Sequence, residues 1–136
     1  MAVRRKHIRD LVERLLFERE IKKPFVPVES IAESLGIQVQ RDQVGDGLSG
    51  FLVRTTGTGE AVIGVNANHT QRRQRFTIAH ELGHYLLHEG EAVHFDGEKP
   101  GVTVNLRNRE SSTGETDIEV EANLFAAELL MPSKFL

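Results

Sequence analysis

Hydrophobic and polar residues change their spacing several times along this chain, and each change marks the end of one structural element. From Arg5 to about Ile21, apolar side chains recur every three or four residues, which predicts an amphipathic helix that Pro24 stops. A shorter helix is expected to begin at Val28 and to end at Gly36. The chain is therefore expected to open with two helices.

The next part of the chain has the spacing of strands. Three apolar segments are separated by glycine-containing turns at 45–47 and 56–59: Ile37–Gln40, Leu48–Arg54 and Ala61–Val65. Short strands joined by tight turns usually pair with their neighbours in sequence. We therefore expect a small, mostly antiparallel sheet.

Helical spacing returns twice in the second half of the chain. One helix is predicted from about Thr70 to His88, and a last one from about Asp117 to Leu130, before Pro132. This order of elements indicates one α+β domain over residues 1–136, in which 1–24 forms an N-terminal helix.

Segment 89–116, between these two helices, is the least regular region. Val102–Leu106 follows Pro100 and Gly101 and has the pattern of an edge strand. The polar run 110–115 has few groups to bury, which predicts a mobile stretch. We interpret the whole segment as a loop and edge-strand insertion.

Composition excludes several classes of protein. The 136 residues carry a net charge of −3, with basic residues gathered in the first helix and acidic residues near the C-terminal end. We expect two solvated faces of opposite charge that attract each other, and direct nucleic-acid binding is not favoured. There is no cysteine, which excludes disulfides and thiolate metal sites. No run reaches membrane-spanning length and no signal-peptide pattern occurs, which favours a cytoplasmic protein.

The most informative residues are His80, Glu81 and His84, which form a His-Glu-x-x-His motif inside the helix predicted at 70–88. Residues four apart project from the same side of a helix, so both imidazoles can reach one ion. Zinc binds neutral imidazole nitrogens, and Glu81 lies within reach of a water molecule on that ion. The motif predicts a zinc site in which Glu81 is the catalytic base.

The rest of this helix supports that interpretation. At about 100° per residue, its apolar residues fill one broad arc, and Thr77, His80, Glu81 and His84 share the remainder, with His88 beside Glu81. This segregation predicts a largely buried helix with one polar side facing a site. The alternative is a surface helix with two solvated histidines.

Two histidines leave a catalytic tetrahedral zinc one protein ligand short. His88 lies eight residues from His80, about 12 Å along a straight helix, so it cannot bind the same ion. We expect it either in a supporting position beside the site or exposed. His94, in the following loop, is a weaker candidate because a loop holds a ligand less rigidly than a helix does.

Better candidates lie on the last helix: Asp117, Glu119 and Glu121. Helical projection places Glu119 inside the apolar arc, between Ala126 and Leu130, where a carboxylate needs a partner such as a metal ion. Glu121 falls about 40° beyond the other edge of the arc and is expected to be solvated. The projection favours Glu119 as the third ligand and leaves Glu121 as the fallback.

Two segments, Arg73–His84 and Glu119–Pro132, resemble the ImmA/IrrE family of zinc metallopeptidases. With a weaker likeness in the strand that ends at Asn66, the resemblance covers most of 31–132. It implies a zincin-type arrangement, in which the small sheet packs on the HExxH helix and on a second, ligand-bearing helix. It also implies a gluzincin-like site whose third ligand is the Glu three residues before Ala122, which is Glu119.

The resemblance further implies a zinc-dependent endopeptidase that regulates transcription in a stress response by cleaving a helix-turn-helix repressor. Family members often continue past Met131-Pro132, so a C-terminal extension is expected to be missing from a chain that ends at Leu136. Two other functions stay open. One is a regulatory module that binds its partner without cleaving it, and the carboxylate of Glu81 argues against it. The other is a small-amide metallohydrolase, and the extended insertion argues against that.

An endopeptidase also needs an oxyanion donor and a place for the substrate chain. Tyr85 and His88 are candidate donors by position alone. If Val102–Leu106 is an edge strand at the cleft, an extended substrate can pair with it by strand addition.

Overall fold

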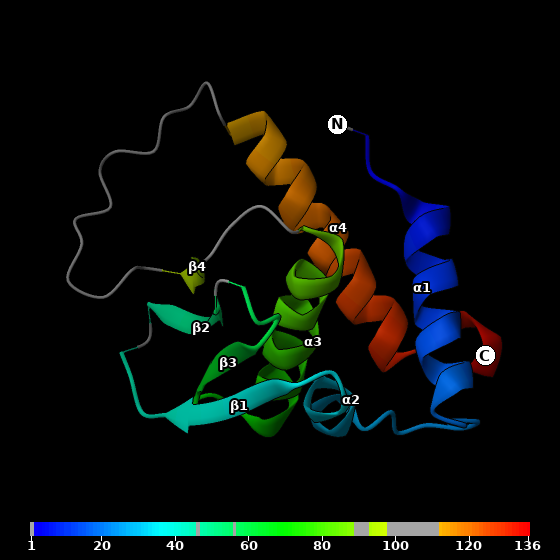
Figure 1. The fold of residues 1–136 in the computed structure, drawn as a ribbon, viewed down its shortest axis with the longest axis horizontal. Coiled ribbons are helices and arrows are strands. Elements are labelled where there is room, and N and C mark those ends of the chain that lie inside the picture. Colours follow the sequence, from blue (N-terminus) through cyan, green and yellow to red (C-terminus); the bar gives the residue numbers. More distant parts are fainter. Residues whose placement is uncertain (1, 46, 56, 89–92, 98–111) are drawn as a thin grey trace.

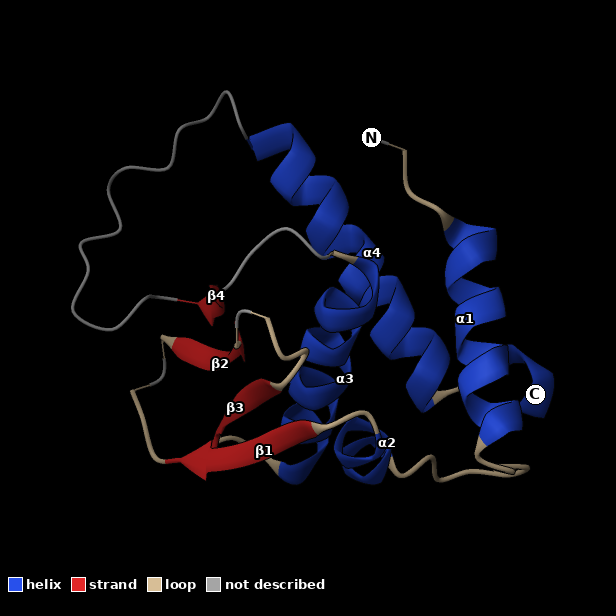
Figure 2. Cartoon of the chain, viewed as in Figure 1, coloured by secondary structure: helices blue, strands red, loops and turns tan. Residues whose placement is uncertain are grey.

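The computed structural model describes residues 2–45, 47–55, 57–88, 93–97 and 112–136. The helices are α1 (Arg5–Glu18), α2 (Val28–Ser34), α3 (Gln71–Leu87), α4 (Ser112–Leu130) and a short 3-10 helix, Ser133–Phe135. The strands are β1 (Ile37–Asp42), β2 (Leu48–Arg54), β3 (Ala61–Asn66) and β4 (Val93–Gly97). The predicted α+β class is confirmed (Figure 1, Figure 2).

The four strands form one sheet in the order β1-β3-β2-β4. β2 pairs antiparallel with both β3 and β4, whereas β1 pairs parallel with β3. The parallel pair arises because the chain passes from β1 into β2 and then returns between them as β3. The sheet is thus mostly antiparallel, as the sequence predicts.

Helix α3 lies between the sheet and α4, and α1 packs on the far side of α4 (Figure 1). Ile78 and Leu82 of α3 are buried in one core with Leu52 and Ile63 of the sheet and with Phe125 of α4. A helix covered on two sides needs apolar residues over a broad arc. The predicted burial of α3 is therefore confirmed.

Two residues determine where α3 begins and how closely it packs against α4. Thr70 caps the start of α3, where its side-chain oxygen accepts a hydrogen bond from the backbone nitrogen of Arg73 at 3.2 Å. Further along, a Cβ atom placed on Gly83 would lie 3.0–3.2 Å from atoms of Phe125. Gly83 thus allows α4 to approach α3 closely.

The helix boundaries differ from the predicted ones at two points. α1 ends at Glu18 rather than Ile21, because the chain leaves helical geometry at Glu20, whose φ is 55°. α4 begins at Ser112 rather than Asp117, so residues 112–115, expected to be mobile, are helical.

The inserted segment also differs where it is described. β4 occupies Val93–Gly97 and pairs with β2, whereas the sequence pattern indicated a loop there. His94 therefore lies on a strand, with its Cα opposite that of Leu52. The predicted edge strand Val102–Leu106 lies outside the described residues, as do 110 and 111.

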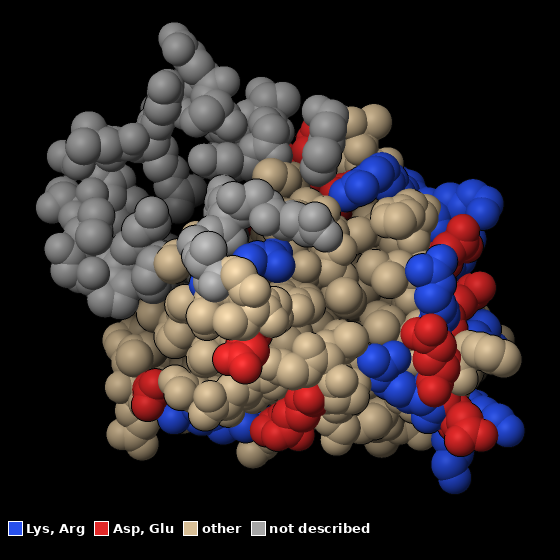
Figure 3. All heavy atoms as spheres, viewed as in Figure 1, with Lys and Arg blue, Asp and Glu red and all other residues tan. Residues whose placement is uncertain are grey.

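The surface of α1 is charged, as predicted, but not uniformly basic. Figure 3 shows Lys and Arg along the α1 side of the molecule with Asp and Glu among them. One such contact is the exposed ion pair between Lys6 Nζ and Asp10 Oδ2, at 2.8 Å. No described helix combines the length and apolar character that crossing a membrane requires.

Candidate metal centre

The polar side of α3 is buried. His80 and His84 are 3% and 2% exposed, and Glu81 has no exposed surface. The two imidazole rings meet edge-on with their centroids 4.7 Å apart, and their Nε2 atoms lie 3.2 Å from each other. The alternative of a surface helix with two solvated histidines is therefore wrong.

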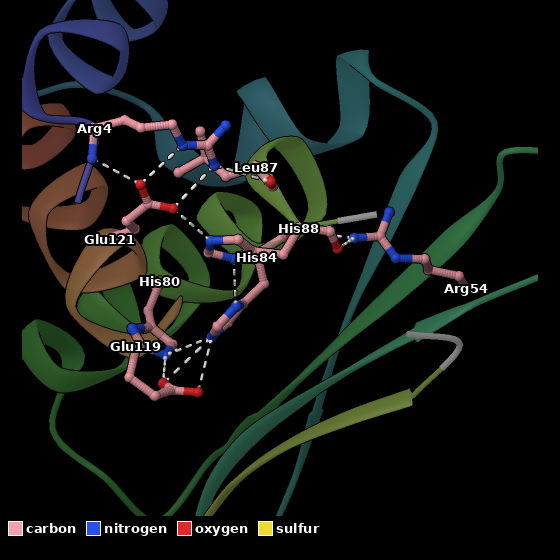
Figure 4. Close-up of polar contacts among 8 residues, drawn as sticks. All are labelled: Arg4, Arg54, His80, His84, Leu87, His88, Glu119 and Glu121. Atoms are coloured by element: carbon pink, nitrogen blue, oxygen red, sulfur yellow. Dashed lines mark hydrogen bonds and ion pairs between the residues drawn. The ribbon is translucent and has the colours of Figure 1, made fainter. Parts of the chain in front are cut away.

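Helix α4 brings Glu119 to this pair (Figure 4). Glu119 Oε1 lies 2.9 Å from His80 Nε2 and 3.3 Å from His84 Nε2. The Glu119 side chain is 41% exposed, whereas both histidines are buried. The group is therefore open to solvent on the side of Glu119.

These three side chains could hold a metal ion. One ligand atom from each residue lies within 4.8 Å of the other two. Ligand atoms about 2.0 Å from a tetrahedral zinc ion are roughly 3.3 Å apart, which is close to the contacts between these atoms. Two imidazole nitrogens and a carboxylate oxygen are also a donor set that zinc accepts. The residues present thus fit a zinc ion in both chemistry and spacing.

Glu81 follows His80 directly and shares the polar side of α3 with both histidines. Its carboxyl group is fully buried. This side of α3 runs close to the sheet, since a Cβ atom on Gly50 of β2 would overlap the side chain of Thr77. The absence of a side chain at Gly50 thus brings the polar side of α3 against β2.

His88 stands behind the histidine pair at the C-terminal cap of α3. Its Nδ1 lies 3.0 Å from His84 Nδ1, and its Nε2 lies 2.9 Å from Glu121 Oε1. Its side chain is only 11% exposed. Of the two expectations for His88, the supporting position beside the site is confirmed and the exposed one is wrong.

The prediction that Glu121 is solvated is wrong, because its side chain has no exposed surface. Helical projection considers α4 alone, whereas the beginning of α1 covers this side of it. The backbone N and side-chain Nε of Arg4 donate to Glu121 Oε2 at 2.8 and 2.9 Å, and Arg4 Nη2 donates to Oε1 at 2.9 Å. Figure 4 shows Arg4 closing over the carboxylate of Glu121.

These contacts change the protonation of the groups involved. The hydrogen bond from Arg4 lowers the pKa of Glu121 from 4.5 to about 2, with a smaller contribution from His88 and against the opposing effect of burial. Burial lowers the pKa of His88, and the hydrogen bond to Glu121 partly offsets this. At neutral pH, an ionised carboxylate therefore lies between a guanidinium and a neutral imidazole.

Arg54, at the end of β2, holds the C-terminal end of α3. Its guanidinium donates to the backbone oxygens of His84 at 2.8 Å, Tyr85 at 3.1 Å and His88 at 2.6 Å. These oxygens lie at the C-terminal end of α3, where a cation is favourable, and that of His84 also accepts from the backbone nitrogen of His88 at 2.9 Å. The hydroxyl of Tyr85, a candidate oxyanion donor, donates to the backbone oxygen of Gly59 at 2.8 Å.

The candidates for the third ligand thus separate. Glu119 meets the histidines, Glu121 lies behind them, and Asp117 is not part of the metal-binding group found among the described residues. Sequence reasoning missed Arg4 and Arg54. The basic N-terminal region is a weak signal for Arg4, and no sequence signal points to Arg54.

Comparison with known proteins agrees with this geometry. The IrrE N-terminal-like domain of the M78 peptidases matches residues 32–136. The chain belongs to this family. The resemblance inferred from the two sequence segments is therefore confirmed.

Two curated proteins are also similar to this chain. Metallopeptidase ImmA of Bacillus subtilis (strain 168) is 32% identical over 109 residues, which are 80% of this chain and 56% of that protein. The uncharacterized immunity region protein 2 of Bacillus phage phi105 is 37% identical over 68 residues, 50% of this chain and 36% of that protein. The matched part of this M78-type domain thus spans about half, or less, of the relatives' length.

Proposed function

We propose that this domain is a zinc-dependent endopeptidase of the gluzincin-like type, in which His80, His84 and Glu119 hold the ion. The observation that carries the proposal is the convergence of one ligand atom from each of these residues within 4.8 Å. The fully buried Glu81, on the same side of α3, supplies the carboxylate that peptide hydrolysis needs. Membership of a metallopeptidase family supports the same assignment.

A zinc ion held by His80, His84 and Glu119 would supply Lewis acidity to the scissile carbonyl and to the attacking water. Glu81 accepts the proton of that water and passes it to the leaving amine. His80 and His84 keep their relative positions because they share one rigid helix. The partial exposure of Glu119 makes its side the approach for a peptide.

We further infer that the substrate is a protein, and specifically a helix-turn-helix repressor in the cytoplasm whose cleavage changes transcription under stress. The likeness to an immunity region protein of a phage supports a regulatory role. An extended substrate has an edge strand to pair with, since β4 is the outermost described strand beyond β2.

The decisive experiment incubates the zinc-loaded protein with any helix-turn-helix repressor encoded beside it, and detects cleavage by mass spectrometry. The wild type should cleave the repressor. The Glu81→Gln variant should bind zinc equally well and lose at least about 1,000-fold in rate, because the general base and the water it orients are both affected. Cleavage by the variant at the wild-type rate would overturn the role of Glu81.

The metal assignment has its own test. Elemental analysis of the purified protein should find one zinc ion per chain, and Glu119→Ala should reduce that content. Treatment with a chelator should stop cleavage, and added zinc should restore it. A repressor that binds the zinc-loaded wild type and stays intact would instead indicate a binding module without peptidase activity.

A further inference from the structure

A continuous chain of polar contacts runs from the candidate ligand His84 to the start of α1. It passes from His84 Nδ1 to His88 Nδ1 at 3.0 Å, and from His88 Nε2 to Glu121 Oε1 at 2.9 Å. Arg4 then donates hydrogen bonds to both oxygens of Glu121. The close-up in Figure 4 shows these side chains in succession, on the side of His84 that faces away from Glu119.

When a metal is bound to His84, the hydrogen bonds from His84 through His88 to Glu121 can have only one arrangement of donors and acceptors. His84 Nε2 lies on the side of His80 and Glu119, so a metal takes its lone pair there. The proton of neutral His84 must then be on Nδ1, from which it is donated to His88 Nδ1. His88 in turn carries its proton on Nε2 and donates it to Glu121, whose carboxylate can only accept.

We propose that His88, Glu121 and Arg4 are positioning residues that hold the His84 ring with Nε2 toward the metal. This inference rests on the function proposed above. Hydrogen-bond partners of a ligating histidine fix its tautomer and orientation and raise its affinity for the metal. Here the first partner is a second histidine, and that histidine in turn donates to the buried carboxylate of Glu121, which Arg4 pairs with.

The same residues also fix the two helices that carry the ligands. Glu121 lies two residues after Glu119 on α4. The hydrogen bonds from Arg4 to Glu121 therefore restrain the turn of the helix that carries Glu119. Arg4 Nη2 additionally donates to the backbone oxygen of Leu87 at 3.3 Å, at the end of α3. Arg4 therefore joins α3 and α4 directly behind the ligands.

Arg4 lies outside residues 32–136, the part that matches the family domain. The segment before that domain is thus in contact with the layer behind the metal ligands. We therefore expect Arg4 to affect metal affinity although it lies far from His84 in sequence and does not contact it. A purely structural role of α1 would change stability and leave the metal site unaltered.

The test uses three substitutions and one matched control in the full chain. His88→Leu removes both hydrogen bonds of the ring. His88→Gln keeps one acceptor and one donor, because a side-chain amide offers both. Arg4→Gln removes the guanidinium. Arg41→Gln removes a guanidinium that also donates two hydrogen bonds to a carboxylate, that of Glu29, and one to Gln74, away from the candidate ligands.

The first readout is the zinc dissociation constant, measured by competition with a chromophoric chelator. His88→Leu should weaken zinc binding by about 10–100-fold, the range expected for loss of such a partner, and Arg4→Gln by about 10-fold. His88→Gln should restore most of the loss, and Arg41→Gln should bind zinc as the wild type does. If His88→Leu does not fold, His88→Gln and Arg4→Gln decide the outcome.

The second readout is long-range proton–nitrogen NMR of the zinc-loaded wild type, which identifies the protonated ring nitrogens. His84 should carry its proton on Nδ1 and His88 on Nε2. Folded variants at His88 and Arg4 with wild-type zinc affinity, or a His88 proton on Nδ1, would overturn the positioning role alone. A wild-type protein without affinity for zinc would overturn the proposed function as well.

Discussion

Two arginine–carboxylate pairs in this molecule are each joined by two side-chain hydrogen bonds and lie in different surroundings. Arg4 holds Glu121 through two side-chain hydrogen bonds of 2.9 Å, and Arg41 holds Glu29 through two of 2.7 and 3.1 Å. The two arginine side chains are similarly exposed, 43% and 39%, whereas Glu121 is fully buried and Glu29 is 40% exposed. The carboxylates thus differ in burial, and Arg41 also donates from Nε to Gln74 Oε1 at 3.0 Å.

Burial of the carboxylate decides what each pair contributes. When an exposed pair breaks, water solvates both groups, so such pairs stabilise a protein by only about 0–1 kcal/mol. A buried carboxylate that loses its partner is left uncompensated, which costs about 3–5 kcal/mol. The Arg4–Glu121 pair should therefore matter for folding as well as for the metal centre, and the Arg41–Glu29 pair for neither to a large extent.

The largest effect should come from Arg4→Ala. We expect the free energy of unfolding of the zinc-free protein to fall by about 2–3 kcal/mol, measured by urea denaturation. The value lies below the full range because the Arg4 side chain is 43% exposed and its backbone nitrogen still donates to Glu121. Arg41→Ala should cost less, about 1–2 kcal/mol, because it breaks an exposed pair and one hydrogen bond to Gln74. Equal costs for the two variants would show that carboxylate burial is not the cause of the difference.

Much of this molecule follows from patterns within single elements. The spacing of His80 and His84 predicts both a helix and a shared direction of the two side chains. The observed α2 ends two residues before the predicted stop at Gly36, and α3 begins directly after the predicted start at Thr70. These properties are local, so a single sequence contains them. The preference for Glu119 over Glu121 rested on the family resemblance and on projection around one helix. The structure brings Glu119 to the histidines, but the burial that the projection predicted is reversed, since Glu119 is 41% exposed and Glu121 is buried.

What the sequence did not reveal depends on partners that are distant along the chain. Glu121 looked solvated because nothing near it in sequence indicates Arg4, 117 residues away. β4 looked like a loop because a short strand is stabilised by its neighbour, here β2, more than by its own composition. Arg54 reaches the end of α3 from another element, 30 residues before His84. Such contacts are decided by tertiary packing.

The pH dependence of the free energy of unfolding is a second property by which the Arg4–Glu121 and Arg41–Glu29 pairs should differ. Glu121 has a pKa of about 2 in the folded protein against 4.5 when unfolded, so its ionised form stabilises the fold above pH 4.5. That contribution should be lost as the pH falls from about 5 to about 2. After a reduction for the exposure of Arg4, it amounts to about 2 kcal/mol.

Urea denaturation of the zinc-free protein across this pH range should therefore show a wild-type advantage over Glu121→Gln that shrinks with acid. Glu29, whose pKa Arg41 also lowers, should give the same sign and a smaller amplitude in the Glu29→Gln variant. A wild-type advantage over Glu121→Gln that stays constant from pH 6 to pH 2 would contradict the assigned ionisation.

Substitutions of Arg54 test whether hydrogen bonds from an arginine to main-chain oxygens at the end of α3 also stabilise the protein. Arg54→Leu removes hydrogen bonds to the backbone of His84, Tyr85 and His88 and should cost about 1–2 kcal/mol. Arg54→Lys keeps the charge without the planar fork and should recover part of this loss. Amide hydrogen exchange in the last turn of α3 should accelerate in Arg54→Leu. Unchanged exchange there would show that Arg54 does not hold the helix end.

The smallest effect, and the sharpest control, is the response of each pair to salt. Glu29→Gln should lower stability by less than about 1 kcal/mol at low ionic strength, and 1 M sodium chloride should remove the difference, because ions screen exposed charges. Salt reaches a buried carboxylate poorly, so Glu121→Gln should keep most of its cost under the same conditions. If salt removes both differences equally, solvent reaches Glu121 as easily as Glu29. Burial of the Glu121 carboxylate would then not distinguish the two pairs.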